Sequence, residues 1–162
     1  MTPEYKDGEP YPAQTERVET SVPAGEPIRL LGIVVEKVGT PRGDGSPGSA
    51  LYRVPIKLSR RPSPLWSELF VQSWDHPPKF TTMHRPGIGS VIGDWVVLDG
   101  TTVDEVARFH KDTLMAVVDE VNRREADLLQ VQKREADRAA EEVARHEREV
   151  RQVADHLSFD RE

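Results

Sequence analysis

Residues 102–157 read TVDEVARFHKDTLMAVVDEVNRREADLLQVQKREADRAAEEVARHEREVRQVADHL and contain neither Gly nor Pro. Such an uninterrupted run of 56 residues predicts one helix about 84 Å long. The helix begins with a capping box, in which the Thr102 hydroxyl accepts from the Glu105 amide and the Glu105 carboxylate reaches back to residue 102. A small domain is much narrower than this helix is long, so part of the helix must project from the domain, where we expect it to meet a partner.

Composition excludes several classes of protein. The chain of 162 residues has no Cys, which excludes a disulfide scaffold, a thiolate metal site and a Cys nucleophile, and which fits a reducing compartment. The N-terminus has no basic start followed by an apolar run, and no stretch of 18 apolar residues occurs. We therefore expect a cytoplasmic protein with no membrane partner.

The net charge of −6 is distributed unevenly along the chain. It amounts to −4 over residues 1–27, +3 over residues 28–100 and −5 over residues 101–162. Affinity for a phosphate backbone needs several clustered cations, so the weakly basic middle segment does not by itself indicate a nucleic-acid-binding domain. It leaves that function open.

Three segments follow from these patterns. Residues 1–27 are rich in Pro, Glu, Gly and Thr and predict a disordered acidic leader; whether the leader folds on a partner stays open. Residues 28–128 predict a small α+β domain that includes the start of the long helix. Residues 129–162 predict a projecting charged helix.

Within the domain, residues 28–38 and 50–58 predict two antiparallel strands joined by a Gly-rich loop, with Pro55 at an edge position or a bulge. Ser63 is the expected N-cap and Pro64 the first residue of a short helix. One face of that helix carries Leu65, Trp66, Leu69, Phe70 and Trp74.

The rest of the domain predicts further strands. Residues 79–84 predict a short strand, and residues 90–92 and 95–98 predict a strand pair with a tight turn, or one bulged strand. Asp99 and Gly100 predict a turn before the long helix. The expected fold class is α+β: a small antiparallel sheet with one short helix, packed on the first half of the long helix, whose second half projects and could form a coiled coil.

The long helix carries two apolar patterns. Its first half has a broad stripe that we expect to cover the sheet: Val103, Val106, Ala107, Phe109, Leu114, Val117, Val118, Val121, Leu128 and Leu129. Its second half repeats an apolar residue every seven positions, at Leu129, Ala136, Val143, Val150 and Leu157. This spacing permits contact with a partner helix, although several neighbouring positions are polar. Self-association, docking on a different protein and a solitary salt-bridged helix all stay open.

Candidate chemistry centres on the loops around residues 75–87. Asp75, His76, His84 and Arg85 form a candidate surface site, and a small hydrolase-like or metal-dependent enzyme using His76, His84 and Asp75 is one alternative function. No HxH, HxxxH or HExxH pattern occurs, so we expect no metal site and no cofactor. His110, early in the long helix, either faces solvent or packs as a polar group against the sheet, and we expect the first.

A second alternative is a nucleic-acid-binding accessory protein that uses the basic region 53–85. Its candidate contacts are Arg53, Lys57, Arg60, Arg61 and Lys79, with Arg85 nearby. Cations beside aromatic side chains can hold single strands by backbone pairing and base stacking. The function that the sequence favours is a non-enzymatic interaction or oligomerisation module, a scaffold or accessory subunit that binds itself or another protein through its C-terminal helix.

Overall fold

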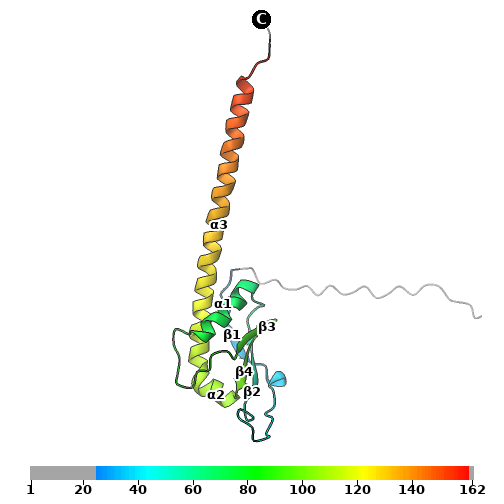
Figure 1. Cartoon of the computed structure of the whole chain (residues 1–162), viewed down its shortest axis with the longest axis vertical. Coiled ribbons are helices and arrows are strands. Elements are labelled where there is room, and N and C mark those ends of the chain that lie inside the picture. Colours follow the sequence, from blue (N-terminus) through cyan, green and yellow to red (C-terminus); the bar gives the residue numbers. More distant parts are fainter. Residues whose placement is uncertain (1–24, 161–162) are drawn as a thin grey trace, which may run out of the picture.

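The computed structural model describes residues 25–160, so the predicted leader lies almost entirely outside the described residues. Four strands, three short helical segments and two longer helices follow one another along the described residues: β1 (Leu30–Ile33), η1 (Val35–Lys37), β2 (Tyr52–Leu58), α1 (Pro64–Asp75), β3 (Gly89–Ile92), β4 (Trp95–Thr101), α2 (Val103–Glu105), the π-helical turn η2 (Val106–His110) and α3 (Lys111–His156). Strands and α1 form a globular base, from which α3 projects (Figure 1). The fold is α+β, as expected. Within residues 25–160, no helix has the length and apolarity needed to cross a membrane.

The strands form one antiparallel sheet in the order β1-β2-β4-β3. Side chains alternate between its faces, so Val54 and Ile56 of β2 share a face with their partners Leu98 and Val96 of β4. This face is buried under α1 and the first turns of α3 and forms the core. The base therefore has two layers, the sheet and a pair of helices.

Pro55 lies in an interior strand, which contradicts the expected edge position or bulge. The register shifts of β2 occur elsewhere, between Tyr52 and Arg53. The Pro55 carbonyl accepts from the Val34 amide at 3.0 Å, one residue beyond the last register pair of β1. The missing N–H of Pro55 therefore falls where the ladder with β1 is already ending, and no strand hydrogen bond is lost.

The predicted short helix is confirmed as α1. The Ser63 hydroxyl accepts from the Trp66 amide at 3.0 Å, and Pro64 is the first helical residue. Trp66, Phe70 and Trp74 are buried, and the Trp66 and Phe70 rings stack with centroids 5.6 Å apart. The aromatic face of α1 thus supplies the largest side chains of the core.

Two predictions about the following segment are wrong. Residues 79–84 form no strand but a loop, in which the His84 amide donates to the Thr81 carbonyl. Asp99 and Gly100 form no turn but continue β4, because Asp99 pairs with Arg53 and its amide donates to the Ile88 carbonyl. The predicted strand pair with a tight turn at residues 93–94 is confirmed as β3 and β4.

The long C-terminal helix is confirmed from Val103 to His156, with one π-helical turn near its start. The Thr102 hydroxyl accepts from the Glu105 amide at 3.0 Å, as the capping box predicts. The Glu105 carboxylate does not complete the box, because it accepts from Arg85 and Thr101 instead.

The apolar stripe of the first half is buried over most of its length. Its fully covered members are Val106, Leu114, Val117, Val118 and Val121. Ala107, Leu128 and Leu129 are exposed, contrary to expectation. His110, which was expected to face solvent, is completely buried against Trp74. The π-helical turn ends at His110, and the ring lies on the side of the helix that faces the core.

Candidate interaction surface on the projecting helix

The helix α3 leaves the base after Glu125, its last buried residue. Residues 126–156 continue as regular helix for about 46 Å without burying a side chain against the base. Isolated helices are only marginally stable in water, and most helical stability in proteins comes from packing of an apolar face. The projecting segment therefore lacks, within the described residues, the packing that stabilises the first part of the helix.

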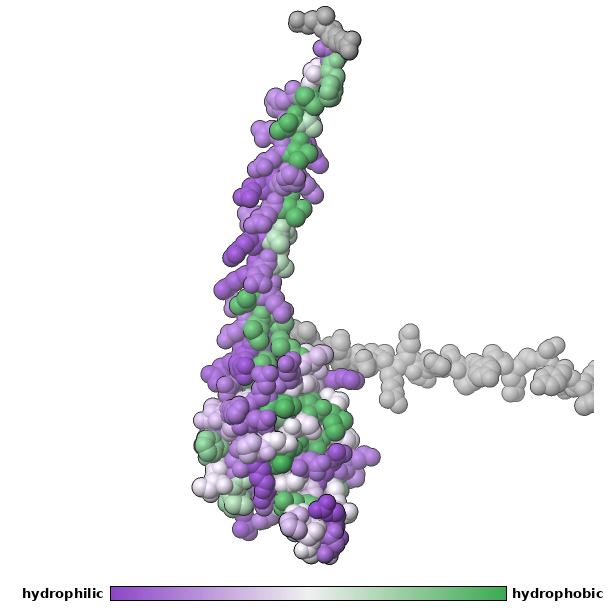
Figure 2. Space-filling model, in the orientation of Figure 1, coloured by the Kyte–Doolittle hydropathy of each residue, from purple (hydrophilic) through white to green (hydrophobic). Residues whose placement is uncertain are grey.

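An apolar stripe follows the projecting segment to its end (Figure 2). We call it the seam and define it by the predicted row of Leu129, Ala136, Val143, Val150 and Leu157, with Ala139, Ala140, Val153 and Ala154 beside that row. Its large members are well exposed: 59% for Val143, 53% for Val150 and 58% for Leu157. The opposite side of the helix is charged and polar, which makes the segment one-sided.

Charge pairing does not stabilise this segment in place of a partner. Among the described residues, ion pairs within 4.0 Å join side chains of the base or of the first helical turns, and none joins two residues of the projecting segment. Pairs of this kind on helix surfaces would contribute only about 0.2–0.5 kcal/mol each. Such pairs would therefore add little to the stability of the projecting segment.

A hollow of about 530 Å³ lies where the seam reaches the base. Ala126, Leu129 and Gln132 of α3 form one wall, and Leu65 of α1 and Arg60 form part of the other. The same helix face thus continues from the seam into a partly apolar depression. This hollow was not foreseen from the sequence, since its walls come from segments more than 60 residues apart.

Asn122 anchors the helix to the base at the edge of this hollow. Its side chain accepts from the Ile28 amide at 3.1 Å and from the Trp66 indole at 2.9 Å, and it donates to the Ile28 carbonyl at 2.9 Å. One turn later, Glu125 accepts from the Ser63 hydroxyl at 2.5 Å. These contacts tie α3 to the start of α1 and to the chain before β1, and so hold the direction in which the helix projects.

A partly buried ion pair of the base joins Arg85 to Glu105. The guanidinium donates to both carboxylate oxygens, at 2.5 and 2.9 Å, and the Thr101 hydroxyl donates to one of them at 2.8 Å. The hydrogen bonds from Arg85 lower the pKa of Glu105 to about 2, and the pair raises the pKa of Arg85. This pair connects the loop after α1 to the start of the long helix.

His110 lies beside this pair, and burial lowers the pKa of its imidazole. Its ring meets the edge of Trp74, with centroids 5.7 Å apart. Within residues 25–160, neither ring nitrogen of His110 has a hydrogen-bond partner. The neutral imidazole is therefore the form that the core accommodates.

The residues of the candidate surface site in the loops each have their own partner or exposure. His84 bonds through Nε2 to the Trp74 carbonyl at 2.8 Å, whereas the Asp75 carboxylate accepts from the Gly87 amide at 2.8 Å and His76 is exposed at the end of α1. Arg85 is engaged with Glu105. The described residues contain no group of three or more His, Cys, Asp or Glu side chains placed to hold a metal ion.

Several cations of the basic region have acidic or carbonyl partners in the base. Arg53 pairs with Asp99, Lys57 with Asp94, and Arg60 donates to the Glu26 carbonyl. Arg61 and Lys79 lie on different loops. The aromatic side chains Trp66 and Trp74, which could have stacked on bases, are buried in the core.

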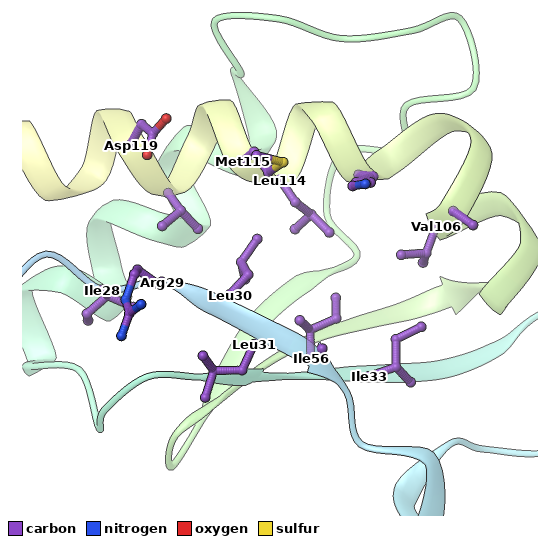
Figure 3. Close-up of a pocket in the computed structure, with 14 residues that line it drawn as sticks. Ile28, Arg29, Leu30, Leu31, Ile33, Ile56, Val106, Leu114, Met115 and Asp119 are labelled. Carbon is purple, nitrogen blue, oxygen red and sulfur yellow. The ribbon is translucent and has the colours of Figure 1, made fainter.

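A second hollow, of about 460 Å³, separates the edge strand β1 from α3. Figure 3 shows Leu30 and Leu114 directed into it from the two sides, with Met115 and Val106 along the helix. Its lining is mainly apolar. Leu31 and Val35 near this edge are exposed. These apolar residues were the sequence feature that could have indicated the hollow, although strand and helix periodicity also allowed both to be buried.

Comparisons of the chain with protein-family models, with curated proteins and with solved structures each found no match.

Proposed function

We propose that this protein is a non-enzymatic oligomerisation module, in which the α+β base orients a helix whose seam binds a second copy of the chain. The observation that carries the proposal is the exposed apolar seam along residues 129–157. Contiguous exposed apolar surface of this kind marks sites of protein association. A scaffold or accessory role fits an association surface of this kind.

The size of the seam supports an association of moderate strength. A fully buried Val or Leu side chain contributes about 1.5–3 kcal/mol, and association costs about 4–15 kcal/mol in lost freedom. Burial of two large apolar residues would not offset the cost of association. Burial of the whole seam, including its alanines, contributes a free energy in the same range as that cost. We therefore expect an assembly whose molar mass rises with protein concentration.

The test is the absolute molar mass of the full chain, measured by light scattering over a range of concentrations. Replacing both Val143 and Val150 with Asp places charges in the seam, so the assembly should dissociate to monomers while the near-ultraviolet signal of the base stays unchanged. A wild-type chain that is monomeric at every concentration would refute self-association.

Position 152 supplies a matched control. Gln152 lies on the side of the helix opposite Val150, so Gln152→Asp and Val150→Asp add the same charge two residues apart. Only Val150→Asp should lower the molar mass. Equal effects of the two variants would show that added charge, and not the seam, controls association.

A further inference from the structure

We infer that two copies pair through their projecting helices in antiparallel orientation, centred near residues 144 and 145, with the helix end of each copy seated at the hollow of the other. The inference rests on the proposed self-association and adds the orientation of the pair. Three independent features support it: the order of small and large residues along the seam, the order of charges beside it, and the position of the hollow.

Apart from Leu129 and Ala154, small and large residues occupy opposite halves of the seam. Ala136, Ala139 and Ala140 lie in the half near the base, and Val150, Val153 and Leu157 lie in the outer half. Pairing in parallel would place alanines against alanines and leave the half near the base thinly packed. Antiparallel pairing about residues 144 and 145 places Ala136 opposite Val153 and Ala139 opposite Val150 of the second copy, so large side chains meet small ones.

Charges beside the seam favour the same orientation. In a parallel pair each residue faces its own counterpart, which brings Lys133 against Lys133 and Glu147 against Glu147 of the second copy, and like charges at such positions are unfavourable. In the antiparallel pair Asp137 faces Arg151 of the second copy. Two-fold symmetry makes this favourable contact twice.

The hollow at the base receives the end of the second helix in this arrangement. The chain end beyond His156 carries Leu157 and Phe159, and Phe159 is 86% exposed. About the same centre, these residues reach the level of Leu129 and Val131 of the other copy, and Leu129 lines the hollow. Each exposed apolar end thus meets the depression where the other seam begins.

The orientation is tested by the distance between spin labels on the full chain carrying Ser158→Cys, since the chain has no other cysteine. In the antiparallel pair the two labels lie at opposite ends, about 40 Å apart at 1.5 Å per residue. In a parallel pair they lie within about 20 Å, because paired helix axes are only about 8–10 Å apart. A dimer with the short distance would overturn the orientation and leave self-association standing, whereas a monomer would overturn both.

Charge reversal gives a second, independent test. Asp137→Arg alone and Arg151→Asp alone should each weaken association about tenfold, through loss of two ion pairs and gain of two repulsive contacts. The double variant should return to near the wild-type dissociation constant. Glu141→Arg, on the side of the helix opposite Val143, makes the same change of charge as Asp137→Arg; it is the control and should change little. Failure of the double variant to recover would contradict the pairing of Asp137 with Arg151.

Discussion

The two parts of α3 differ in what covers them, although both are amphipathic helix. Between Lys111 and Glu125 the apolar face packs on α1 and the sheet, and Leu114, Val117 and Val121 are buried. Between Ala126 and His156 the helix is also one-sided, but within residues 25–160 none of its side chains is buried. The same helical pattern is therefore covered in the first part and left open in the second, where the proposed second copy would cover it.

The same contrast holds for charged side chains. In the base, the Arg85–Glu105 pair is partly buried and has several hydrogen bonds. On the projecting segment the charged side chains are solvated and unpaired within the described residues. Polar groups therefore join segments of the base to one another, whereas on the projecting helix they contact water.

Gly89→Val should destabilise the base most strongly while leaving the seam intact. A Cβ at Gly89 would lie 2.8 Å from the Trp74 ring, and Trp74 is completely buried. We expect a loss of about 3 kcal/mol in the free energy of unfolding of the base, because the ring cannot move without disturbing the core. Tryptophan fluorescence during urea unfolding measures this loss. Ser90→Ala is the neighbouring control, and an unchanged midpoint for Gly89→Val would contradict the packing described.

A smaller effect is expected for Glu105→Gln, which removes the charged partner of Arg85. The loss should be about 2 kcal/mol, the size of a hydrogen-bonded charged contact that is partly buried. Asp104→Asn is the matched control, since its pair with Arg108 is exposed, with 66% and 68% of the two side chains accessible. That variant should change the free energy of unfolding by less than about 0.5 kcal/mol. If Glu105→Gln and Asp104→Asn lowered the free energy of unfolding equally in thermal unfolding, the charge at the helix start, and not the pair of Arg85 with Glu105, would be responsible for the loss.

Two titratable groups, Glu105 and His110, make the stability of the base depend on pH. The pKa of Glu105 is about 2 in the folded base against an ordinary 4.5, so the unfolded chain binds more protons in that range and stability falls as the pH drops from 4.5 toward 2. Burial lowers the pKa of His110 below its ordinary 6.5, despite the nearby Glu105 charge, with Arg85 and His84 acting in the same direction as burial. Stability from this group is complete above pH 6.5 and declines below it.

Urea unfolding between pH 3 and pH 8 measures both effects. The wild-type base should lose stability in two steps as the pH falls, and Glu105→Gln should lack the step below pH 4.5 while keeping the one below pH 6.5. His110→Gln should show the reverse. A variant profile parallel to that of the wild type would exclude the corresponding group as the cause.

Local signals in the sequence predicted the elements that depend on neighbouring residues. The Ser63-Pro64 start of α1, the Thr102 cap and the absence of Gly and Pro after it each determine backbone hydrogen bonds within a few positions. The turn at Gly93, with a positive φ of 60°, likewise predicted the pairing of β3 with β4. The sequence also predicted the row of candidate contact residues on the projecting helix, because helical periodicity alone places these residues on one side.

The failures concern residues whose state depends on distant partners. Pro55 was assigned to an edge because the sequence does not show that the β1 ladder ends beside it. His110 was assigned to solvent because its polarity does not show that Trp74 lies across from it. Arg85 carried no signal for Glu105, 20 residues away, and the hollow at the base needed walls from α1 and α3 together.

By itself, the sequence determined a long helix with an apolar seam, a short aromatic helix and an antiparallel strand pair, because these follow from periodicity and capping within a few residues. Only the tertiary structure decided which part of the long helix is covered, where it leaves the base, and which charged and imidazole groups are buried. The physical reason is that burial is a property of contacts between segments far apart in the chain, and local periodicity shows which face is apolar without showing what lies against it.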